Sequence, residues 1–81
     1  MARISKQDFI DSLSLHVDIE TKAEATRILS YILQELTDAM VRGDTVHLSG
    51  FGKFEPFTRA NGKVSPKFRP ASALLREVAG Q

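Results

Sequence analysis

The chain has 81 residues, 42% of them hydrophobic, and 11 Lys and Arg against 10 Asp and Glu give a formal net charge of +1. It contains no cysteine, which excludes disulfides, thiolate metal sites and a cysteine nucleophile. This length predicts one domain over residues 1–81, whose small core gives little net stability unless oligomerisation adds to it.

Two stretches near the start of the chain have the pattern of helix N-termini. In Ser5-Lys6-Gln7-Asp8 and in Thr21-Lys22-Ala23-Glu24, a hydroxyl can accept from an early helical N–H while an acid three residues later reaches back. The first predicts a short helix over about residues 6–16. The second predicts a long helix that ends near Arg42, followed by Gly43 at the position where a C′ glycine is expected.

Apolar residues recur at helical spacing along the predicted long helix, and they cover more of it than a single contact surface needs. They are Ala25, Ile28, Leu29, Tyr31, Ile32, Leu33, Leu36, Ala39 and Met40. One interpretation is a core helix of a single chain with one overhanging tyrosine. We favour the other, a helix shared between two subunits, because a small domain has little with which to cover both flanks.

Strand patterns follow the long helix. Thr45-Val46-His47-Leu48 alternates polar and apolar residues, as a half-buried strand does, and His47 is expected to point outward or into an interface. Gly50 and Gly52 flank Phe51, which suits a sharp turn or bulge before a second strand. Core positions are expected for four aromatic residues, Phe51, Phe54, Phe57 and Phe68.

Asn61-Gly62 predicts a two-residue type I′ hairpin, which would place Thr58 opposite Ser65 and Pro56 opposite Lys67. Pro56 and Pro66 lack an N–H, so they indicate strands with a free edge or an early end. Pro70 closes the strand region. A short final helix is predicted from Ser72 to Val78, with its inner face formed by Ala73, Leu74 and Val78.

The charge changes sign along the chain. Residues 1–52 carry five basic side chains against eight acidic ones, a balance of −3, whereas residues 53–76 carry six basic side chains against Glu55 alone, a balance of +5. This asymmetry indicates a face that binds a polyanion. The six basic residues are Lys53, Arg59, Lys63, Lys67, Arg69 and Arg76.

The element order and motifs closely resemble the HU and integration host factor family of bacterial histone-like DNA-binding proteins, over about residues 4–79. The motifs are Arg42-Gly43-Asp44, Gly50-Phe51-Gly52-Lys53-Phe54 and Phe68-Arg69-Pro70. The resemblance implies an α+β fold with two N-terminal helices, a three-stranded antiparallel sheet and a short C-terminal helix, arranged as an intertwined dimer. The helical dimerisation part would span residues 4–43, and the sheet with the last helix residues 44–79.

The resemblance also implies an architectural, largely sequence-independent role on duplex DNA. The protein would act at the nucleoid in the bacterial cytoplasm and would be encoded by a bacterium or a phage. Family members wrap DNA with a long β-ribbon arm, and a proline near its tip kinks the duplex. Here Arg59-Ala60-Asn61-Gly62-Lys63 turns straight back, and no residue matches the tip proline. We therefore expect a truncated arm, binding mainly through phosphates, and reduced bending.

Seven basic residues are candidate DNA-binding positions: Lys6, Lys22, Lys53, Arg59, Lys63, Lys67 and Arg69. Lys6 and Lys22 match places near the helix starts where the family holds phosphates, and helical N–H groups there attract anions. Arg69 falls in the family's aromatic-basic-proline run. The other four are assigned from their charge. A single exposed Lys or Arg is most often only solvated, so their clustering carries the prediction.

Two further classes of function compete with DNA binding. A protein-interaction module could pair with a full-length HU-type subunit and bind little DNA itself. An enzyme is not expected, because the chain has no Ser-His arrangement and no phosphate-cradling glycine loop ahead of a helix. His16 and His47 lack the neighbours that a zinc site needs, and no cofactor is expected.

The predicted partners are double-stranded DNA and a second subunit, either identical or related in sequence. A membrane and a small-molecule substrate are not expected partners. The first residues lack the apolar core of a signal peptide, and no window approaches 18 consecutive apolar residues, which predicts a cytosolic protein.

Overall fold

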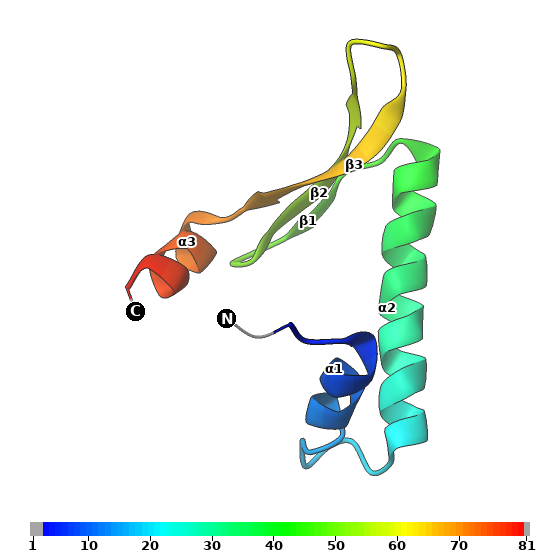
Figure 1. Ribbon diagram of the computed structural model, residues 1–81, viewed down its shortest axis with the longest axis vertical. Coiled ribbons are helices and arrows are strands. Elements are labelled where there is room, and N and C mark those ends of the chain that lie inside the picture. The colour runs from blue at the N-terminus through cyan, green and yellow to red at the C-terminus, as the bar shows by residue number, and fades with distance from the viewer. Residues whose placement is uncertain (1–2, 81) are drawn as a thin grey trace. The chain divides into compact units, whose positions relative to one another are not determined.

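A computed structural model describes residues 3–80, and its elements follow the predicted order (Figure 1). They are α1 (Lys6–Leu13), α2 (Lys22–Arg42), β1 (Val46–Leu48), β2 (Gly52–Thr58), β3 (Val64–Pro70) and α3 (Ser72–Ala79). The chain divides into two compact units, Met1–Gln34 and Glu35–Gln81, whose boundary falls within α2. Within residues 3–80, none of the helices has both the length and the apolar character needed to cross a bilayer.

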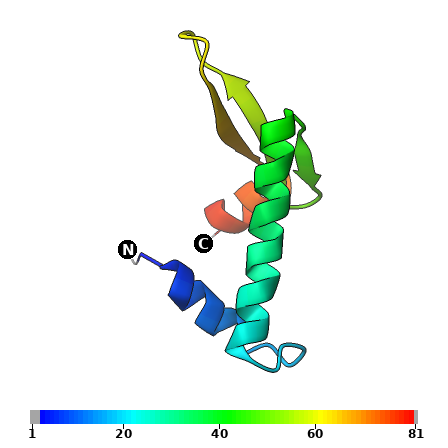
Figure 2. The same cartoon turned by 90° about the vertical axis from the view of Figure 1, so that its right-hand side faces the viewer.

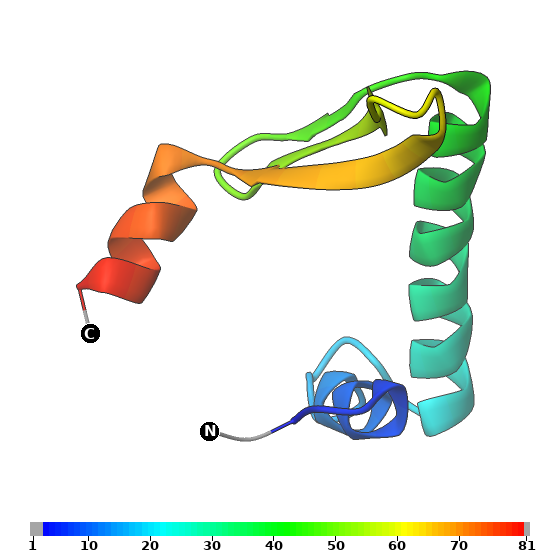
Figure 3. The ribbon, with the colours of Figure 1, turned by 45° about the horizontal axis from the view of Figure 1, so that its top comes forward.

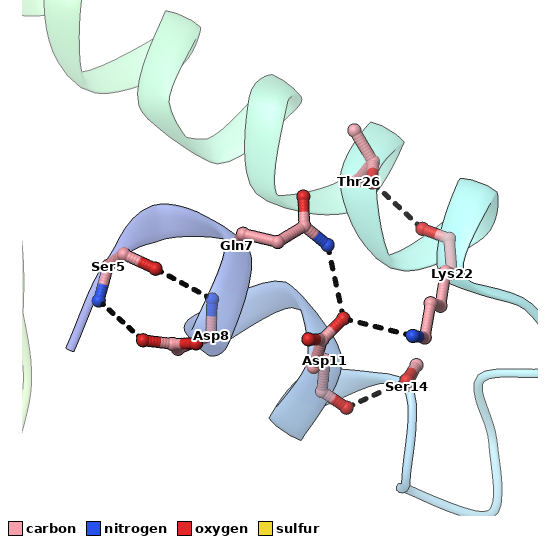
Figure 4. A network of polar contacts seen from close by, with 7 residues as sticks. All are labelled: Ser5, Gln7, Asp8, Asp11, Ser14, Lys22 and Thr26. Atoms are coloured by element: carbon pink, nitrogen blue, oxygen red, sulfur yellow. Dashed lines mark hydrogen bonds and ion pairs between the residues drawn. The ribbon is translucent and has the colours of Figure 1, made fainter.

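The predicted capping box at the start of α1 is confirmed. Ser5 Oγ accepts a hydrogen bond from the Asp8 N–H at 3.1 Å, and the Asp8 carboxylate accepts one from the Ser5 N–H at 3.1 Å (Figure 4). The helix ends at Leu13, earlier than predicted, because the chain turns at Ser14. There the Ser14 hydroxyl donates to the Asp11 carbonyl at 2.7 Å.

The capping box predicted for α2 is confirmed only in half. Thr21 Oγ1 accepts from the Glu24 N–H at 3.0 Å, as expected. The Glu24 carboxylate, however, accepts from the Glu20 N–H at 3.3 Å, one residue before the position that the motif specifies. The Thr21 contact still supplies a partner for an N–H group of the first turn.

A small core joins α1 to the first turns of α2, which lie beside it in Figure 2. It consists of Ile10, Ala25 and Leu29, with Leu13 and Ile19 packed against it. Much of the apolar stripe of α2 stays in contact with solvent. Tyr31 is 66% exposed, and Ile32 and Leu33 are also exposed. The interpretation with one overhanging tyrosine is therefore wrong, and a helix shared between subunits stays the prediction.

The C-terminus of α2 ends as predicted, at a glycine. Gly43 has a φ of +85°. Its N–H donates to the Met40 carbonyl at 3.1 Å, and the Asp44 N–H donates to the Ala39 carbonyl at 2.9 Å. These two bonds are those of a Schellman motif. Arg42 Nε donates to Asp44 Oδ2 at 2.9 Å, and this bond raises the pKa of the Arg42 guanidinium.

The second unit contains a three-stranded antiparallel sheet in the order β1-β2-β3, with α3 following β3 (Figure 3). The strand β3 is therefore an edge strand, as the proline at position 66 indicated. The strand β1 pairs with β2 only from Gly52 to Phe54. Pro56 lies beyond that paired segment, where its missing N–H leaves no gap in the β1–β2 ladder.

The hairpin between β2 and β3 differs from the predicted type I′ turn. That turn needs positive φ at both central residues, whereas Gly62 has a φ of +85° and no described non-glycine residue has a positive φ. The Gly62 N–H donates to the Arg59 carbonyl at 2.9 Å, and the Arg59 N–H donates to the Lys63 carbonyl at 2.7 Å. The loop thus has three residues, in a type I turn followed by a left-handed glycine.

The longer loop shifts the strand register by one residue relative to the prediction. Pro56 lies opposite Pro66, and Thr58 lies opposite Val64. The predicted pairs of Thr58 with Ser65 and of Pro56 with Lys67 are therefore wrong. A shift of one residue exchanges the two faces of a strand, so this correction decides which side chains share a surface.

The last helix begins and ends close to the predicted bounds, but its predicted inner face is only partly correct. Ala73 and Leu74 are half-buried, whereas Val78 is 68% exposed in the single chain. Ala71 occupies the N-cap position and makes no side-chain capping bond.

Gly52 is buried at the point where β2 meets β3. A Cβ at this position would lie 2.5 Å from the Arg69 carbonyl oxygen and 2.6 Å from a ring carbon of Phe68. Gly52→Ala should therefore force the two strands apart and lower the free energy of unfolding by about 1–3 kcal/mol. Urea unfolding of Gly52→Ala beside the exposed control Ser49→Ala measures this. Equal unfolding midpoints for the two variants would contradict the close approach.

Candidate nucleic-acid interface

The observed register gathers most of the predicted basic residues on one face of the sheet. Residues directly opposite in an antiparallel pair share a face, and alternate residues of a strand do too. His47 lies opposite Lys53, Lys53 opposite Arg69, and Glu55 opposite Lys67. We call this side the charged sheet face, and its residues are His47, Lys53, Glu55, Phe57, Arg59, Lys63, Ser65, Lys67 and Arg69.

The predicted register would have divided these charges between the two faces. Lys67 opposite Pro56 would have shared the side of Phe54, away from Lys53. In the structure the side of Phe54 is apolar instead. Phe54 and Phe68 are directly opposite with ring centroids 4.8 Å apart, and Phe51 lies 5.4 Å from Phe68. All five sheet residues predicted to bind DNA therefore lie together.

Glu55 is the single acidic residue on the charged sheet face, and its side chain lies between two of the basic side chains. Its carboxylate is 3.7 Å from Lys53 Nζ and 3.5 Å from Arg69 Nε, while its side chain is 23% exposed. A phosphate that approaches Lys53 or Arg69 must compete with this carboxylate. Glu55 thus lowers the positive charge that the face presents to a polyanion.

Removing the charge of Glu55 should strengthen the binding of duplex DNA. Exposed ion pairs are worth about 0.2–1 kcal/mol each, so Glu55→Gln should raise the affinity up to about fivefold at low salt. Fluorescence anisotropy with a labelled duplex measures the change. Glu35→Gln, which removes a charge from α2, is the matched control and should change the affinity less. A lower affinity for Glu55→Gln than for the unchanged protein would contradict this role.

An open hollow of about 650 Å³ lies at the base of the charged sheet face. His47, Lys53 and Arg69 line it on the strands, and Ala71 and Leu75 line it from the end of β3 and from α3. The hollow is wide open to solvent, and its three basic side chains suit an anionic group such as a phosphate better than a buried small molecule.

Near the hairpin, the side chains of Phe57, Arg59, Ser65 and Lys67 lie next to one another. Arg59 Nε donates to Ser65 Oγ at 3.3 Å, and Lys67 Nζ lies 4.7 Å from the centroid of the Phe57 ring. The prediction of Phe57 as a core residue is therefore wrong, because the register turns it toward the charged side. Phe51 and Phe68 are on the apolar side but stay exposed in the single chain.

The two predicted helix-start lysines belong to the first unit. Lys6 is the first residue of α1 and is exposed, and Lys22 is the first residue of α2. Lys22 Nζ forms an ion pair with Asp11 Oδ1 at 3.2 Å, and Gln7 Nε2 donates to the same oxygen at 3.1 Å (Figure 4). A phosphate at Lys22 must therefore compete with Asp11.

The contacts of Asp11 lower the pKa of its carboxyl group. The hydrogen bond from Gln7 is the larger cause, and the contact with Lys22 adds to it. Because the pKa is lower in the folded protein, the stabilisation from Asp11 is present above the unfolded pKa and is lost as the pH falls through the folded value. Among residues 3–80, no group of His, Asp and Glu is arranged to hold a metal ion.

Sequence reasoning assigned Phe57 to the core, in preference to stacking on bases, and did not name Glu55 as part of this surface. The signal that could have found them is the hairpin, because an Asn-Gly pair also fits a three-residue loop that has its glycine in the left-handed position. That alternative would have placed Phe57 and Lys67 on one face from the sequence alone.

A long helix closed by a Schellman motif and followed by a short antiparallel sheet, with one apolar and one basic face, is the architecture of an HU-type DNA-binding domain. The family model described as "Bacterial DNA-binding protein" matches residues 4–66. DNA-binding protein HU of Thermotoga maritima is 31% identical over 91 residues, covering 93% of this chain and 99% of the relative. The chain belongs to this family of bacterial DNA-binding proteins, which includes HU and integration host factor.

Further relatives and solved structures are consistent with membership of this family. DNA-binding protein HU of Xylella fastidiosa (strain 9a5c) is 30% identical over 90 residues, covering 93% of this chain and 95% of the relative. The structure of HU from Thermotoga maritima matches with a TM-score of 0.75 and 32% identity, over 91% of this chain and 97% of that one. A cocrystal structure of Anabaena HU with DNA matches with a TM-score of 0.78 over 95% and 99%, and its 23% identity shows the fold alone.

The alignments are also longer than this chain. The one with Thermotoga maritima HU spans 91 positions, whereas this chain has 81 residues, so the relative has residues without a counterpart here. The three-residue loop between β2 and β3 agrees with a shortened arm at that place.

Proposed function

We propose that this protein is an architectural, largely sequence-independent DNA-binding protein of the HU type, which binds duplex DNA mainly through its phosphates and bends it little. One observation carries the proposal: the charged sheet face collects five Lys and Arg side chains, of which only Lys53 and Arg69 contact an acid on that face. Family membership supports the DNA-binding role, and the family is architectural rather than enzymatic.

Contacts with phosphates suit this face better than the reading of bases. Lys53, Lys67 and Arg69 stand on two paired strands, in which opposite residues are about 4.5–5.5 Å apart. Arg59 and Lys63 flank the loop that joins these strands. Such a row can follow a phosphate backbone. Reading the bases requires side chains inserted into a groove, with bidentate contacts to base edges. We therefore expect similar affinity for different duplex sequences.

The protein acts as a dimer in this proposal, with a second copy of itself or a related subunit. In the single chain, large apolar side chains on α2, the sheet and α3 are exposed, among them Tyr31, Ile32, Phe51, Phe68 and Val78. A second chain that covers them supplies the core that one chain lacks. Because the named relatives are bacterial HU and integration host factor proteins, we place this protein at the bacterial nucleoid.

The alternative of a protein-interaction module with little DNA binding is not favoured. A partner subunit without a DNA-binding role would have no need for five basic residues on one sheet face. The single domain predicted over residues 1–81 is also part of the proposal.

The salt dependence of binding tests the phosphate contacts. About three to five phosphates per subunit are within reach, and log affinity should fall with log salt by about 0.9 for each. Lys6→Ala, Lys22→Ala and Arg69→Ala should each weaken binding to all duplex sequences equally. Lys6→Ala should reduce the slope by about one, whereas Lys22→Ala and Arg69→Ala should reduce it by less, because Asp11 and Glu55 already pair with these two side chains. Titrations of two unrelated duplexes at several salt concentrations measure both effects.

The matched control for these variants is Arg42→Ala. It removes one positive charge from the end of α2, where Arg42 is already paired with Asp44. It should lower the affinity slightly and leave the slope unchanged. Strong preference for one sequence, combined with weak dependence on salt, would contradict binding through phosphates.

A further inference from the structure

Phe57 is the only large apolar side chain among the nine residues of the charged sheet face. It lies directly opposite Ser65, with Glu55 and Arg59 as its neighbours on the same side of β2. The residue is 46% exposed. A phenylalanine in this position contributes little to the core of its own sheet, whose aromatic cluster lies on the other face.

The ring of Phe57 is surrounded by groups that bind anions. Lys67 Nζ lies 4.7 Å from its centroid, and Arg59 and Ser65 are hydrogen-bonded beside it. The ammonium group shows that a face of this ring is open to a partner. An exposed cation–π contact is weak, so a flat ligand that covers the ring can displace the ammonium group at little cost.

An exposed aromatic ring on a sheet, flanked by Lys and Arg, is the combination that binds single-stranded nucleic acid. The basic groups follow the backbone, and the ring stacks on a base whatever its identity, because every base has a π-face. In an intact duplex each base is covered by its neighbours. Phe57 should therefore stack most readily on an unpaired base, whose faces are open without the cost of unstacking a base pair.

We propose that the charged sheet face binds unpaired nucleotides, with a base stacked on Phe57 and the flanking phosphates held by Lys67 and Arg59. This inference rests on the proposed function, since it assigns a second ligand to the same DNA-binding face. It concerns single strands and gaps, which offer an unpaired base. A nick offers none, so Phe57 gives no preference for nicked duplex.

Oligothymidine and an abasic oligodeoxyribonucleotide of the same length test the stacking, because they carry the same phosphates and differ only in the bases. The unchanged protein should bind oligothymidine about fivefold or more tightly than the abasic strand. Phe57→Ala should remove this difference. Lys67→Ala, the matched control, should weaken binding to both strands by a similar factor and preserve the difference.

Phe57→Trp gives a second readout, since the chain has no tryptophan of its own. Its fluorescence should be quenched by oligothymidine and change little with intact duplex or the abasic strand. Equal affinity for the two strands, or no selective quenching, overturns the stacking site. A Phe57→Ala variant that loses its circular dichroism signal or its dimer also overturns it, because the ring then has a structural role.

The two proposals fail in different ways. If the unchanged protein binds duplex with the expected salt dependence but does not distinguish oligothymidine from the abasic strand, only the stacking site is wrong. If it binds no duplex, the proposed function is wrong, and preference for oligothymidine would still support the role of Phe57.

Discussion

Replacing Ile32 by Asp should leave the protein without a stable fold. Ile32 belongs to the apolar stripe of α2 and is 49% exposed in the single chain, so we expect it in the interface with a second subunit. An aspartate there would place an unpaired charge in an apolar interface, and a lost partner of a buried charge typically costs about 3–5 kcal/mol. Leu36→Asp should have the same effect. Circular dichroism at micromolar concentration measures the loss.

Ser30→Asp is the control for this prediction. Ser30 is an exposed polar residue of the same helix, two positions from Ile32, so its replacement tests the charge without the apolar contact. The unchanged protein should sediment as a dimer, and its unfolding midpoint should rise with protein concentration, since folding is coupled to association. A folded monomer at micromolar concentration would contradict the shared helix.

The starts of the first two helices and the end of α2 could be predicted from the sequence because local interactions decide them, whereas α1 ends earlier than predicted. The capping box at Ser5 requires only a hydroxyl and an acid three residues apart. The end of α2 at Gly43 requires only a glycine that can adopt a positive φ after the last helical turn. For the capping box of α2, the predicted bond from the Glu24 N–H to Thr21 is confirmed, whereas the predicted bond from the Thr21 N–H to the Glu24 carboxylate is wrong. The Glu24 carboxylate can accept from either of two neighbouring N–H groups, and the spacing of the residues does not determine which one.

The strand register could not be predicted with the same security. An Asn-Gly pair is compatible with a two-residue loop and with a three-residue loop, and the two differ in the conformations of Ala60 and Asn61. This single choice determines whether Lys67 lies beside Phe57 or on the opposite face. The sequence therefore predicted the presence of a basic sheet but not the composition of its surface.

Contacts between distant residues were also beyond the sequence. The pairing of Lys22 with Asp11 depends on how α1 packs against α2, and the contact of Glu55 with Arg69 depends on the register. Asp11 offsets the positive charge of Lys22, and Glu55 offsets the positive charges of Lys53 and Arg69. All three basic residues were predicted to bind DNA because of their charge. A prediction made from formal charges therefore overstates how freely Lys22, Lys53 and Arg69 can meet a phosphate.

The second large effect concerns the bending of DNA, which should be much weaker than for relatives with long arms. Kinking by this family depends on an apolar wedge, a proline near the tip of the arm, and unstacking a base step costs a few kcal/mol that the wedge must offset. The loop here consists of Ala60, Asn61 and Gly62, none of which is a large apolar residue. Pro66 lies within the ladder opposite Pro56, away from the loop.

The length of the hairpin leads to the same result. Beyond Phe54, the last residue paired with β1, the strand β2 continues for only four residues, about 13 Å at 3.3 Å per residue. A ribbon of this length is too short to follow the minor groove around the duplex as a long arm does. The protein should therefore bind linear duplex with little bending and gain little affinity from a nick.

Ring closure of a short duplex by ligase and energy transfer between dyes on its two ends both measure the bend. With this protein, the closure rate and the distance between the dyes should stay near those of free DNA, at concentrations where anisotropy shows full binding. A long-armed HU measured alongside should change both. If this protein changes them equally, some group other than a tip wedge bends the DNA.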